Sequence, residues 1–365
     1  MRPGPHGPGL IASAVTAPFC HAERMVLLPL VGFVAAIVLL WRTGSRPSST
    51  VLRVSRRRIV ILPARNEAMS IDAACGAIVG ELRDGDVFMV VDDHSSDDTA
   101  ARASSVGATV LAASTLPDGW RGKCWACWTG VEASPQPESD DLLVFVDADV
   151  TLQPGALDRL DLLQSTNGGL VSFLPHHRPG SAVEQLSIFG NLAAAMGSGA
   201  FAPFDHRVST AFGPVMAMDR TTYDTVGGHA AVRGELVEDI ALARLIDPVT
   251  VVCDPALTTY RMYPGGWGEV SAGWIRNLKL GITRGPWWAT IVVALWITAI
   301  AGGPFAWWGW YPIAVVHLAW CARRVGRFAP WAIVLYPIAL AVFVMLVLRS
   351  GLSRRLRWRG RLLDR

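Results

Sequence analysis

The sequence lacks a second cysteine pair that could join Cys124 and Cys127 in a metal site. Without such a pair the spacing disfavours structural zinc. A thioredoxin-like redox pair stays open, but the Trp-rich surroundings favour two small buried side chains. The net charge is only +3 over 365 residues, and the arginine clusters are not interleaved with exposed aromatic residues. We therefore expect no nucleic-acid partner.

Long apolar runs are absent from the middle of the chain and concentrated at its ends, although the mean hydropathy is +0.34. Residues 25–41 carry no charge and match the length of a bilayer span. A signal peptide is the alternative for this run, but no small-residue cleavage site follows it. Three more apolar runs, 287–301, 305–321 and 330–348, predict a C-terminal membrane region, the first two as a hairpin around 302–304.

Arginines flank these runs and predict contacts with anionic lipid. Arginine is denser after the first run than before it, which predicts a cytoplasmic central domain at the cell membrane. The last run conflicts with this rule, because arginines stand on both sides of it; re-entry at Pro337 is left open. The clusters are Arg53, Arg56, Arg57 and Arg58; Arg323, Arg324 and Arg327; and Arg354, Arg355, Arg357, Arg359 and Arg361.

These patterns predict five regions. Residues 1–24 are rich in Pro, Gly and Ala and are expected to be disordered. Residues 25–41 form an anchor, 50–284 a catalytic α/β domain, 286–349 the C-terminal transmembrane region and 350–365 a basic tail.

Strands and helices alternate through the central domain, which predicts an α/β fold with a mostly parallel sheet. We expect strands at 59–62, 87–91, 109–111, 142–146 and 170–174. We expect helices at 71–82 with Ser70 as cap, and at 99–105, 124–131, 181–196 and 240–246. Residues 227–229 are expected to form a turn, and His176 and His177 to lie in a loop.

Acidic side chains follow the buried strands. Asp147 and Asp149 end the apolar strand 142–146, and paired negative charge there calls for neutralisation. A divalent cation is the simplest candidate, and it would in turn hold a diphosphate; a solvated strand end is the alternative. Asp93 follows another strand, and ligands bind at such carboxyl ends.

Two later features are further candidates. Lys123 opens a helix, where a phosphate would be well placed; a surface lysine is the alternative. Asp239 stands at the start of another helix, which the helix dipole alone would explain. The functional interpretation makes Asp239 a general base.

Taken together, these motifs resemble the inverting family 2 glycosyltransferases of GT-A fold. The resemblance covers roughly residues 57–245. It rests on Pro63-Ala64-Arg65-Asn66-Glu67, Val91-Asp92-Asp93-His94-Ser95-Ser96-Asp97, Asp147-Ala148-Asp149 and Glu238-Asp239, in the family's order.

The resemblance implies a role for each of these residues. Asp93 would bind the base of a nucleotide sugar, and Pro63, Arg65 and Glu67 would line its pocket. Asp147 and Asp149 would sit at the ribose and at Mg²⁺ or Mn²⁺. Lys123 would face the diphosphate or the acceptor. Asp239 would deprotonate the acceptor as it attacks with inversion; a carboxylic acid, already ionised at neutral pH, would need that base less.

A narrower resemblance is to the membrane-bound 4,4'-diaponeurosporenoate glycosyltransferases and the hopanoid-associated glycosyltransferases. It rests on residues 116–126, Gly227-Gly228-His229, Met262-Tyr263-Pro264 and Gly273-Trp274. It implies transfer of a hexose, with glucose from a UDP-sugar as the expected case, to a lipid-like acceptor such as a carotenoid acid. Transfer in hopanoid or polyprenyl-phosphate lipid synthesis is the alternative.

Two related activities are disfavoured by what is missing. The interval after Asp239 lacks the Gln/Arg-x-x-Arg-Trp motif of processive polysaccharide synthases. The first strand is not followed by the Gly-rich, Lys- or Arg-bearing loop of sugar-nucleotide transferases. A non-catalytic membrane scaffold is the third alternative, and the complete acidic set argues against it.

Overall fold

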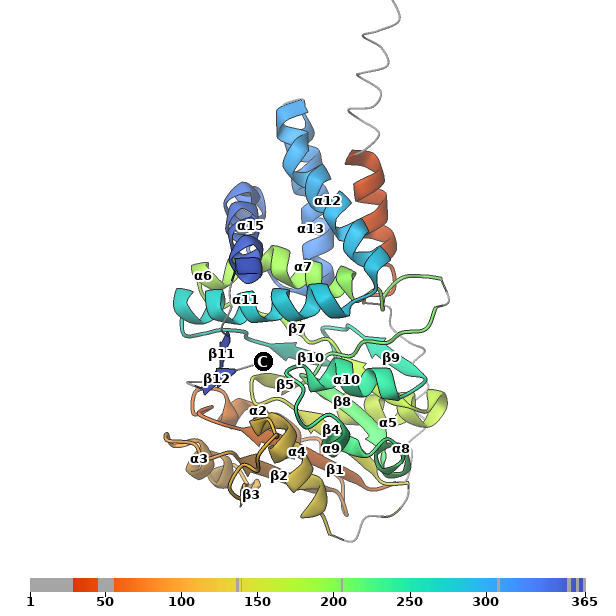
Figure 1. Ribbon diagram of the computed structural model, residues 1–365, viewed down its shortest axis with the longest axis vertical. Coiled ribbons are helices and arrows are strands. Elements are labelled where there is room, and N and C mark those ends of the chain that lie inside the picture. Colours follow the sequence, from red (N-terminus) through yellow and green to blue (C-terminus); the bar gives the residue numbers. More distant parts are fainter. Residues whose placement is uncertain are drawn as a thin grey trace, which may run out of the picture.

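A computed structural model describes residues 29–44, 56–135, 138, 140–204, 206–306, 309–352, 356–358 and 361–363. It consists of an α/β domain with a lobe of helices above it (Figure 1). The predicted disorder at 1–24 lies outside the described residues. So does much of the predicted tail, where β11 (Leu356–Trp358) pairs with β12 (Arg361–Leu363).

A seven-stranded sheet forms the centre of the α/β domain, in the order β3-β2-β1-β4-β8-β6-β9. All neighbouring strands are parallel except at β8, which is antiparallel to β4 and β6. The prediction of a mostly parallel α/β sheet is thereby confirmed. The strands are β1 (Arg58–Ala64), β2 (Val87–Asp92), β3 (Thr109–Ala112), β4 (Leu142–Val146), β6 (Leu170–Phe173), β8 (Val215–Asp219) and β9 (Val249–Val252).

Both faces of this sheet are covered by helices, so its central strands are apolar on both sides. In β4, Val144 packs in the core with α2, α3 and α5, whereas Phe145 packs in the core with α4, α8 and α10. Cys124 and Cys127, on α4, are both buried, as expected. The helices are α2 (Ile71–Val79), α3 (Thr99–Ser105), α4 (Gly122–Glu132), α5 (Ala156–Asn167), α8 (Arg220–Thr225), α9 (Gly228–Ala231) and α10 (Glu238–Leu245).

A second sheet joins β5 (Val150–Leu152), β10 (Thr258–Tyr260) and β7 (His176–His177). The expectation that His176 and His177 lie in a loop is wrong. Both are buried in β7, where they pair with Thr259 and Tyr260. This pairing depends on a strand more than eighty residues away, which local sequence does not reveal.

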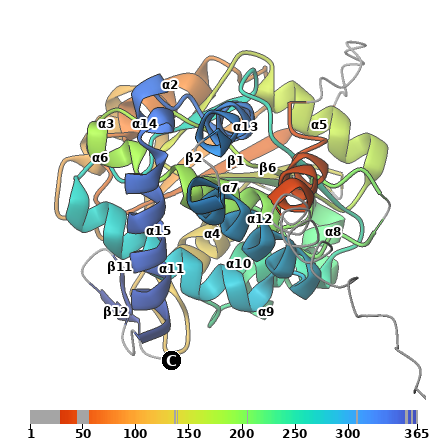
Figure 2. The same ribbon diagram turned by 90° about the horizontal axis from the view of Figure 1, so that it is seen from above.

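The helical lobe packs around one apolar core, and in Figure 1 its helices stand on the layer formed by α7 and α11. Its N-terminal part is the helix over 29–39. The predicted helix 181–196 is divided into two, and residues 302–304 lie inside a helix instead of turning a hairpin. The elements are α6 (Ala182–Gln185), α7 (Ile188–Gly197), α11 (Trp267–Arg284), α12 (Trp287–Ala306), α13 (Trp310–Val325), α14 (Pro330–Val334) and α15 (Tyr336–Leu352), seen from above in Figure 2.

Within the described residues, none of the helices is both long enough and apolar enough to cross a bilayer. The predicted crossings at 25–41, 287–301, 305–321 and 330–348 are therefore not supported. These runs are helical where they are described, but they pack on one another and on α7. The last one is interrupted at Leu335, between α14 and α15, two residues before Pro337.

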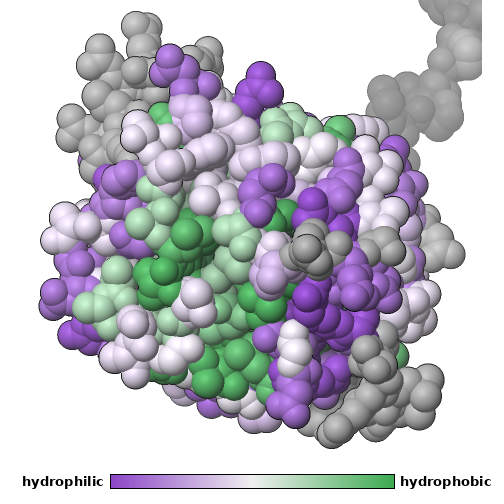
Figure 3. Space-filling view, turned by 90° about the horizontal axis from the view of Figure 1, so that it is seen from below, coloured by the Kyte–Doolittle hydropathy of each residue, from purple (hydrophilic) through white to green (hydrophobic). Residues whose placement is uncertain are grey.

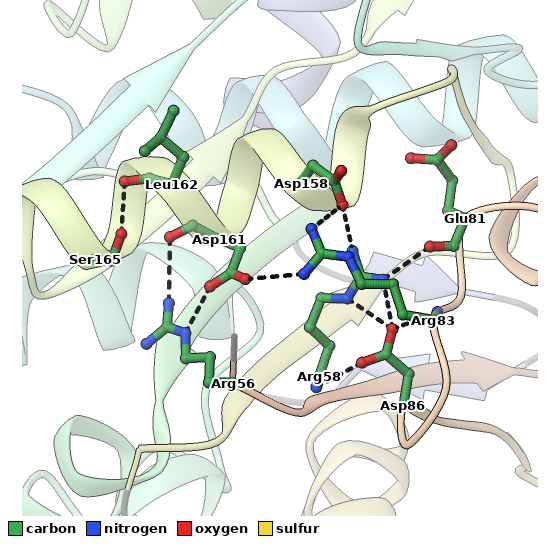
Figure 4. A network of polar contacts seen from close by, with 9 residues as sticks. All are labelled: Arg56, Arg58, Glu81, Arg83, Asp86, Asp158, Asp161, Leu162 and Ser165. Carbon is green, nitrogen blue, oxygen red and sulfur yellow. Dashed lines mark hydrogen bonds and ion pairs between the residues drawn. The ribbon is translucent and has the colours of Figure 1, made fainter. Parts of the chain in front are cut away.

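Arg56, Arg57 and Arg58, around the start of β1, are engaged in ion pairs within the protein instead of the predicted contacts with lipid. Arg56 pairs with Asp161 at 2.6 Å, and Arg57 pairs with Asp141. The fully buried Arg58 reaches Asp158 at 2.8 Å and donates its Nε to Asp86 at 2.8 Å. Figure 4 shows the contacts of Arg56 and Arg58, with Arg83 also donating to Asp158. Burial demands such partners, because an unpaired charge there is costly. Arg53 and the cluster at 354–361 lie outside the described side chains.

Two local expectations also change. Ser70 occupies the cap position of α2, but its side chain makes no capping bond and donates to the Glu67 carboxylate instead, at 3.1 Å. Gly227-Gly228-His229 leads into α9, with His229 buried.

At the end of the molecule away from the lobe, Figure 3 shows an apolar area bordered by hydrophilic residues.

Arg58→Ala should destabilise the fold by about 3–5 kcal/mol, because it leaves Asp86 buried without its cation. Urea unfolding of the full chain, followed by circular dichroism, measures this change. Arg102→Ala is the matched control: its pair with Asp72 at 2.8 Å is exposed on both sides and should contribute less than about 1 kcal/mol. Equal losses in the two variants would contradict the structural role of Arg58.

Candidate active site

A cavity of about 1290 Å³ lies between the carboxyl ends of the central strands and the helical lobe. The eight predicted site residues, drawn from separate segments of the chain, all line it. The structure therefore brings together in one cavity residues that are spread over 177 positions of the sequence. The role of each of these residues stays a prediction. They are Pro63, Arg65, Glu67, Asp93, Lys123, Asp147, Asp149 and Asp239.

Hydrogen bonds join the loop after β1 to the loop after β2. The backbone N–H of Asn66 donates to Ser95 Oγ at 2.9 Å, and Asn66 Oδ1 accepts from the N–H of Ser96 at 2.8 Å. The N–H of Glu67 donates to Thr99 Oγ1 at 2.8 Å. Many polar groups of these two motifs therefore bond to one another and hold the loops that form the cavity wall.

Two residues of these loops have left-handed backbones, with φ of +54° at Asn66 and +58° at His94. Such conformations are uncommon for residues other than glycine and gather at ligand sites. Between the two loops, Arg65 Nη1 donates to the carbonyl oxygen of Asp93 at 2.6 Å and lies 3.5 Å from its carboxylate. Arg65 thus orients the buried Asp93 at the cavity wall.

Lys123 forms the centre of the acidic cluster. From the first turn of α4 its Nζ lies 2.8 Å from Asp147 Oδ1 and 2.8 Å from Glu238 Oε1. Its side chain is 21% exposed, which excludes the alternative of a surface lysine. Its ammonium charge is matched by two carboxylates, so it ties the end of β4 to the start of α10.

The close packing of these charges changes their protonation. Burial opposes the charge on Lys123, but the Asp147 and Glu238 carboxylates raise its pKa well above the ordinary value. Burial raises the pKa of Asp147 although Lys123 opposes it. Burial also acts to raise the pKa of Glu238, but the charge and hydrogen bond of Lys123 outweigh this effect, and the pKa is lowered. Lys123 and Glu238 therefore stay charged at neutral pH.

Asp239 is held beside this pair. Its Oδ2 accepts the backbone N–H of Gly213 at 2.7 Å, and its Oδ1 accepts that of Ile240 at 2.8 Å. Burial and the adjacent charge of Glu238 raise the pKa of Asp239 to about 7, against the opposing effect of Lys123. A carboxyl with this pKa can take up a proton near neutral pH, as a general base must.

The residues present fit a divalent cation only in part. No group of three or more His, Cys, Asp or Glu side chains that could hold a metal is found in the described part of the chain. Asp147 and Asp149 do supply hard oxygen ligands at the cavity wall. Mg²⁺ is commonly bound by one or two carboxylates, with substrate phosphates and waters as its other ligands. The donor set fits such a substrate-completed site.

Two charged groups that act on the acidic cluster, Glu238 and Arg276, were given no role from the sequence. Glu238 was recognised in a motif but given no role, although it is the second partner of Lys123. Arg276 on α11 also lines the cavity, and its charge acts to lower the pKa of Asp147. Its position after the Gly273-Trp274 pair was the available signal, but α11 itself was not predicted.

The chain resembles known glycosyltransferases. Residues 119–261 match the model for glycosyl transferase family 21. The chain is 30% identical over 330 residues to 4,4'-diaponeurosporenoate glycosyltransferase of Staphylococcus aureus strain MRSA252, covering 83% of this chain and 87% of the relative. The protein of that name from strain USA300 is 29% identical with the same coverage.

A solved structure shares the fold. It is the mannosyltransferase PcManGT of Pyrobaculum calidifontis in complex with GDP-Man and Mn²⁺, with a TM-score of 0.54 and 17% identity. The similarity covers 91% of this chain and 97% of that one. The predicted GT-A-type α/β fold is confirmed.

Glu238→Gln should lower the pKa of Asp239 below about 7, because the neighbouring negative charge that raises it is removed. Infrared difference spectra of the full chain, recorded against pH, follow the absorption of the protonated carboxyl; Asp239→Asn identifies the band. Asp224→Asn, at an exposed pair on α8, is the control and should leave the titration unchanged. An unchanged midpoint in Glu238→Gln would contradict this coupling.

Proposed function

Because the chain belongs to the glycosyltransferase family that includes 4,4'-diaponeurosporenoate glycosyltransferase, we propose that it transfers a hexose from a nucleotide sugar to a lipid-like acceptor, with inversion. The observation that carries this proposal is the meeting of Asp93, Asp147, Asp149 and Asp239 on one cavity. Glucose from a UDP-sugar is the proposed donor group, and the carboxyl of a carotenoid acid is the proposed acceptor.

The donor would bind at the sheet end of the cavity. Asp93, oriented by Arg65, would accept hydrogen bonds from the base, and Pro63 and Glu67 would border it. Asp147 and Asp149 would hold Mg²⁺ or Mn²⁺, which when bound offsets the charge of the leaving diphosphate. Lys123 keeps Asp147 in place and adds positive charge where negative charge grows in the transition state.

Asp239 would remove the acceptor's proton. A carboxylic acid in water is ionised at neutral pH and needs no base, but an apolar environment raises its pKa as it does that of any carboxyl. Beside the partly buried Asp239, the pKa of an acid acceptor would be raised, and the acid would stay protonated to higher pH. A base with a pKa of about 7 is suited to removing that proton.

The surface of the lobe supports a membrane-associated enzyme. Most of the large apolar side chains that are exposed belong to its helices, among them Val34, Trp287, Val316, Ile338 and Leu348. Contiguous exposed apolar surface marks interaction sites. We place the lobe against a lipid surface at the cell membrane, with the catalytic domain on the cytoplasmic side.

The overall activity is tested with membranes that contain the protein. They are incubated with a panel of labelled nucleotide sugars, and the extracted lipids are analysed by mass spectrometry. A labelled lipid that depends on Mg²⁺ or Mn²⁺ is expected. Transfer to polymer, or no transfer from any donor, would count against the proposal.

Asp239→Asn should lower the transfer rate by about 10²–10⁴-fold, the usual contribution of a general base. In the wild type the rate should fall as pH drops below about 7, because protonated Asp239 cannot accept a proton. Steady-state transfer between pH 5 and 9 measures both effects. Asp224→Asn is the control, and a wild-type rate in Asp239→Asn would remove the base assignment.

Asp149→Asn should weaken Mn²⁺ binding in the presence of UDP by about 10–100-fold, because a hard anionic ligand becomes neutral. Electron paramagnetic resonance titration of the full chain measures free Mn²⁺ directly, without turnover. Asp84→Asn, at an exposed turn, should bind like the wild type. Equal affinities in the wild type and Asp149→Asn would show that Asp149 is not a metal ligand.

A further inference from the structure

We propose that the lobe half of the cavity is a channel for the hydrocarbon chain of the acceptor, with its floor formed by the small residues of α7. This inference rests on the proposed function and adds where the acceptor's chain lies. It makes the channel, not the acidic cluster, the part of the enzyme that selects acceptors by the bulk of their chain.

The size of the cavity is the first argument. Sites for single small molecules commonly enclose about 300–1,000 Å³. The cavity has about 1290 Å³ and continues from the acidic cluster into the lobe. A nucleotide sugar at the sheet end would leave the lobe end for a second substrate.

The floor of the lobe end is one face of a helix. On α7 the residues that line the cavity include Gly190, Ala193, Ala194 and Gly197, at the spacing i, i+3, i+4, i+7. Residues with this spacing share one side of a helix. Because none of them has a side chain larger than a methyl group, α7 leaves open a groove at Ala193, Ala194 and Gly197. At Gly190 the Trp274 indole packs over the helix, within 2.7 Å of a Cβ placed there.

One wall, from α11, carries Glu269 and Arg276, but two other walls are apolar. These two come from α12 with Val293, Ala294 and Ile297, and from α15 with Phe343 and Val347. No charged side chain lines the cavity among the described residues of α7, α12 and α15. A polar chain, such as an oligosaccharide, would lose hydrogen bonds to water here and gain none.

Three polar side chains of the channel already have hydrogen-bond partners within the protein. Ser198 Oγ donates to the Ala195 carbonyl at 2.7 Å, and Thr298 Oγ1 donates to the Ala294 carbonyl at 2.8 Å. Asn191 Nδ2 donates to the Ser187 carbonyl at 3.0 Å. Because these three groups have partners within the protein, the surface that they leave for a ligand is largely hydrocarbon.

A hydrogen bond connects the channel to the strands beside the proposed metal ligand Asp149. Asn191 Oδ1 accepts the hydroxyl of Tyr260 at 2.9 Å, and Tyr260 pairs across β10 and β5 with Val150, next to Asp149. One end of the α7 groove is therefore held beside the proposed metal ligand. A chain lying in the groove would direct its polar head to the sugar carbon.

Gly197→Phe tests the channel directly. A Cβ at Gly197 meets no atom within 4 Å, so the larger side chain can enter the channel without displacing backbone. Gly302→Phe is the matched control: Gly302 is also helical and exposed, has the same open space, and does not line the cavity.

The readout is saturable photolabelling by a diazirine-bearing fatty acid of the full chain in phosphatidylcholine vesicles. Peptides containing residues 290–298 and 343–348 should be labelled, and excess unlabelled fatty acid should suppress this labelling, unlike labelling of the outer lobe surface. Gly197→Phe should reduce the saturable part about tenfold, while Gly302→Phe leaves it unchanged. Non-saturable labelling, or equal labelling in both variants, would overturn the channel.

UDP binding with Mg²⁺, measured by calorimetry on the same samples, separates this inference from the proposed function. Nucleotide binding without saturable labelling would overturn the channel alone. Saturable labelling without any nucleotide binding would overturn the proposed donor and leave an apolar-chain site.

Discussion

The double ion pair of Lys123 organises the candidate active site. It joins the first turn of α4, the end of β4 and the start of α10, at 2.8 Å to each of two carboxylates. Without the ammonium, the buried carboxylate of Glu238 and the partly exposed carboxylate of Asp147 would face each other beside Asp239 with no cation between them, which is unfavourable. Because the pair also limits how far the pKa of Asp239 rises, one residue controls both the geometry and the protonation of the cluster.

The cavity has two chemically different ends because two kinds of architecture form it. Loops at the carboxyl ends of β1, β2 and β4 turn sharply and expose backbone and carboxylate groups, which suits a charged nucleotide sugar. Helices satisfy their own backbone hydrogen bonds, so α7, α12 and α15 can present an apolar wall. Asp149 and Asp239 line the same cavity as both surfaces, so the proposed donor and acceptor would meet beside them.

Local patterns anticipated much of this arrangement. Strands β1 to β4 and helices α3 and α10 lie close to their expected bounds, because apolar runs and helical spacing are local properties. Strands β8, β9 and β10 were not anticipated, since they are stabilised by partners distant in the chain. Arg56 and Arg58 were assigned to lipid for the same reason: their aspartate partners are at least 28 residues away.

The sequence by itself determined the α/β class, the family and the acidic residues that gather at the site. The reason is that strand ends and the order of motifs can be recognised from short stretches of neighbouring residues. Only the tertiary structure decided that Lys123 binds Glu238, that Arg56 and Arg58 form internal ion pairs, and that α7, α12 and α15 line an apolar extension of the site. The physical reason is that charge pairing and burial depend on which surfaces meet in space. Those contacts join segments that are far apart in the chain, and the local sequence does not show that these segments are close in space.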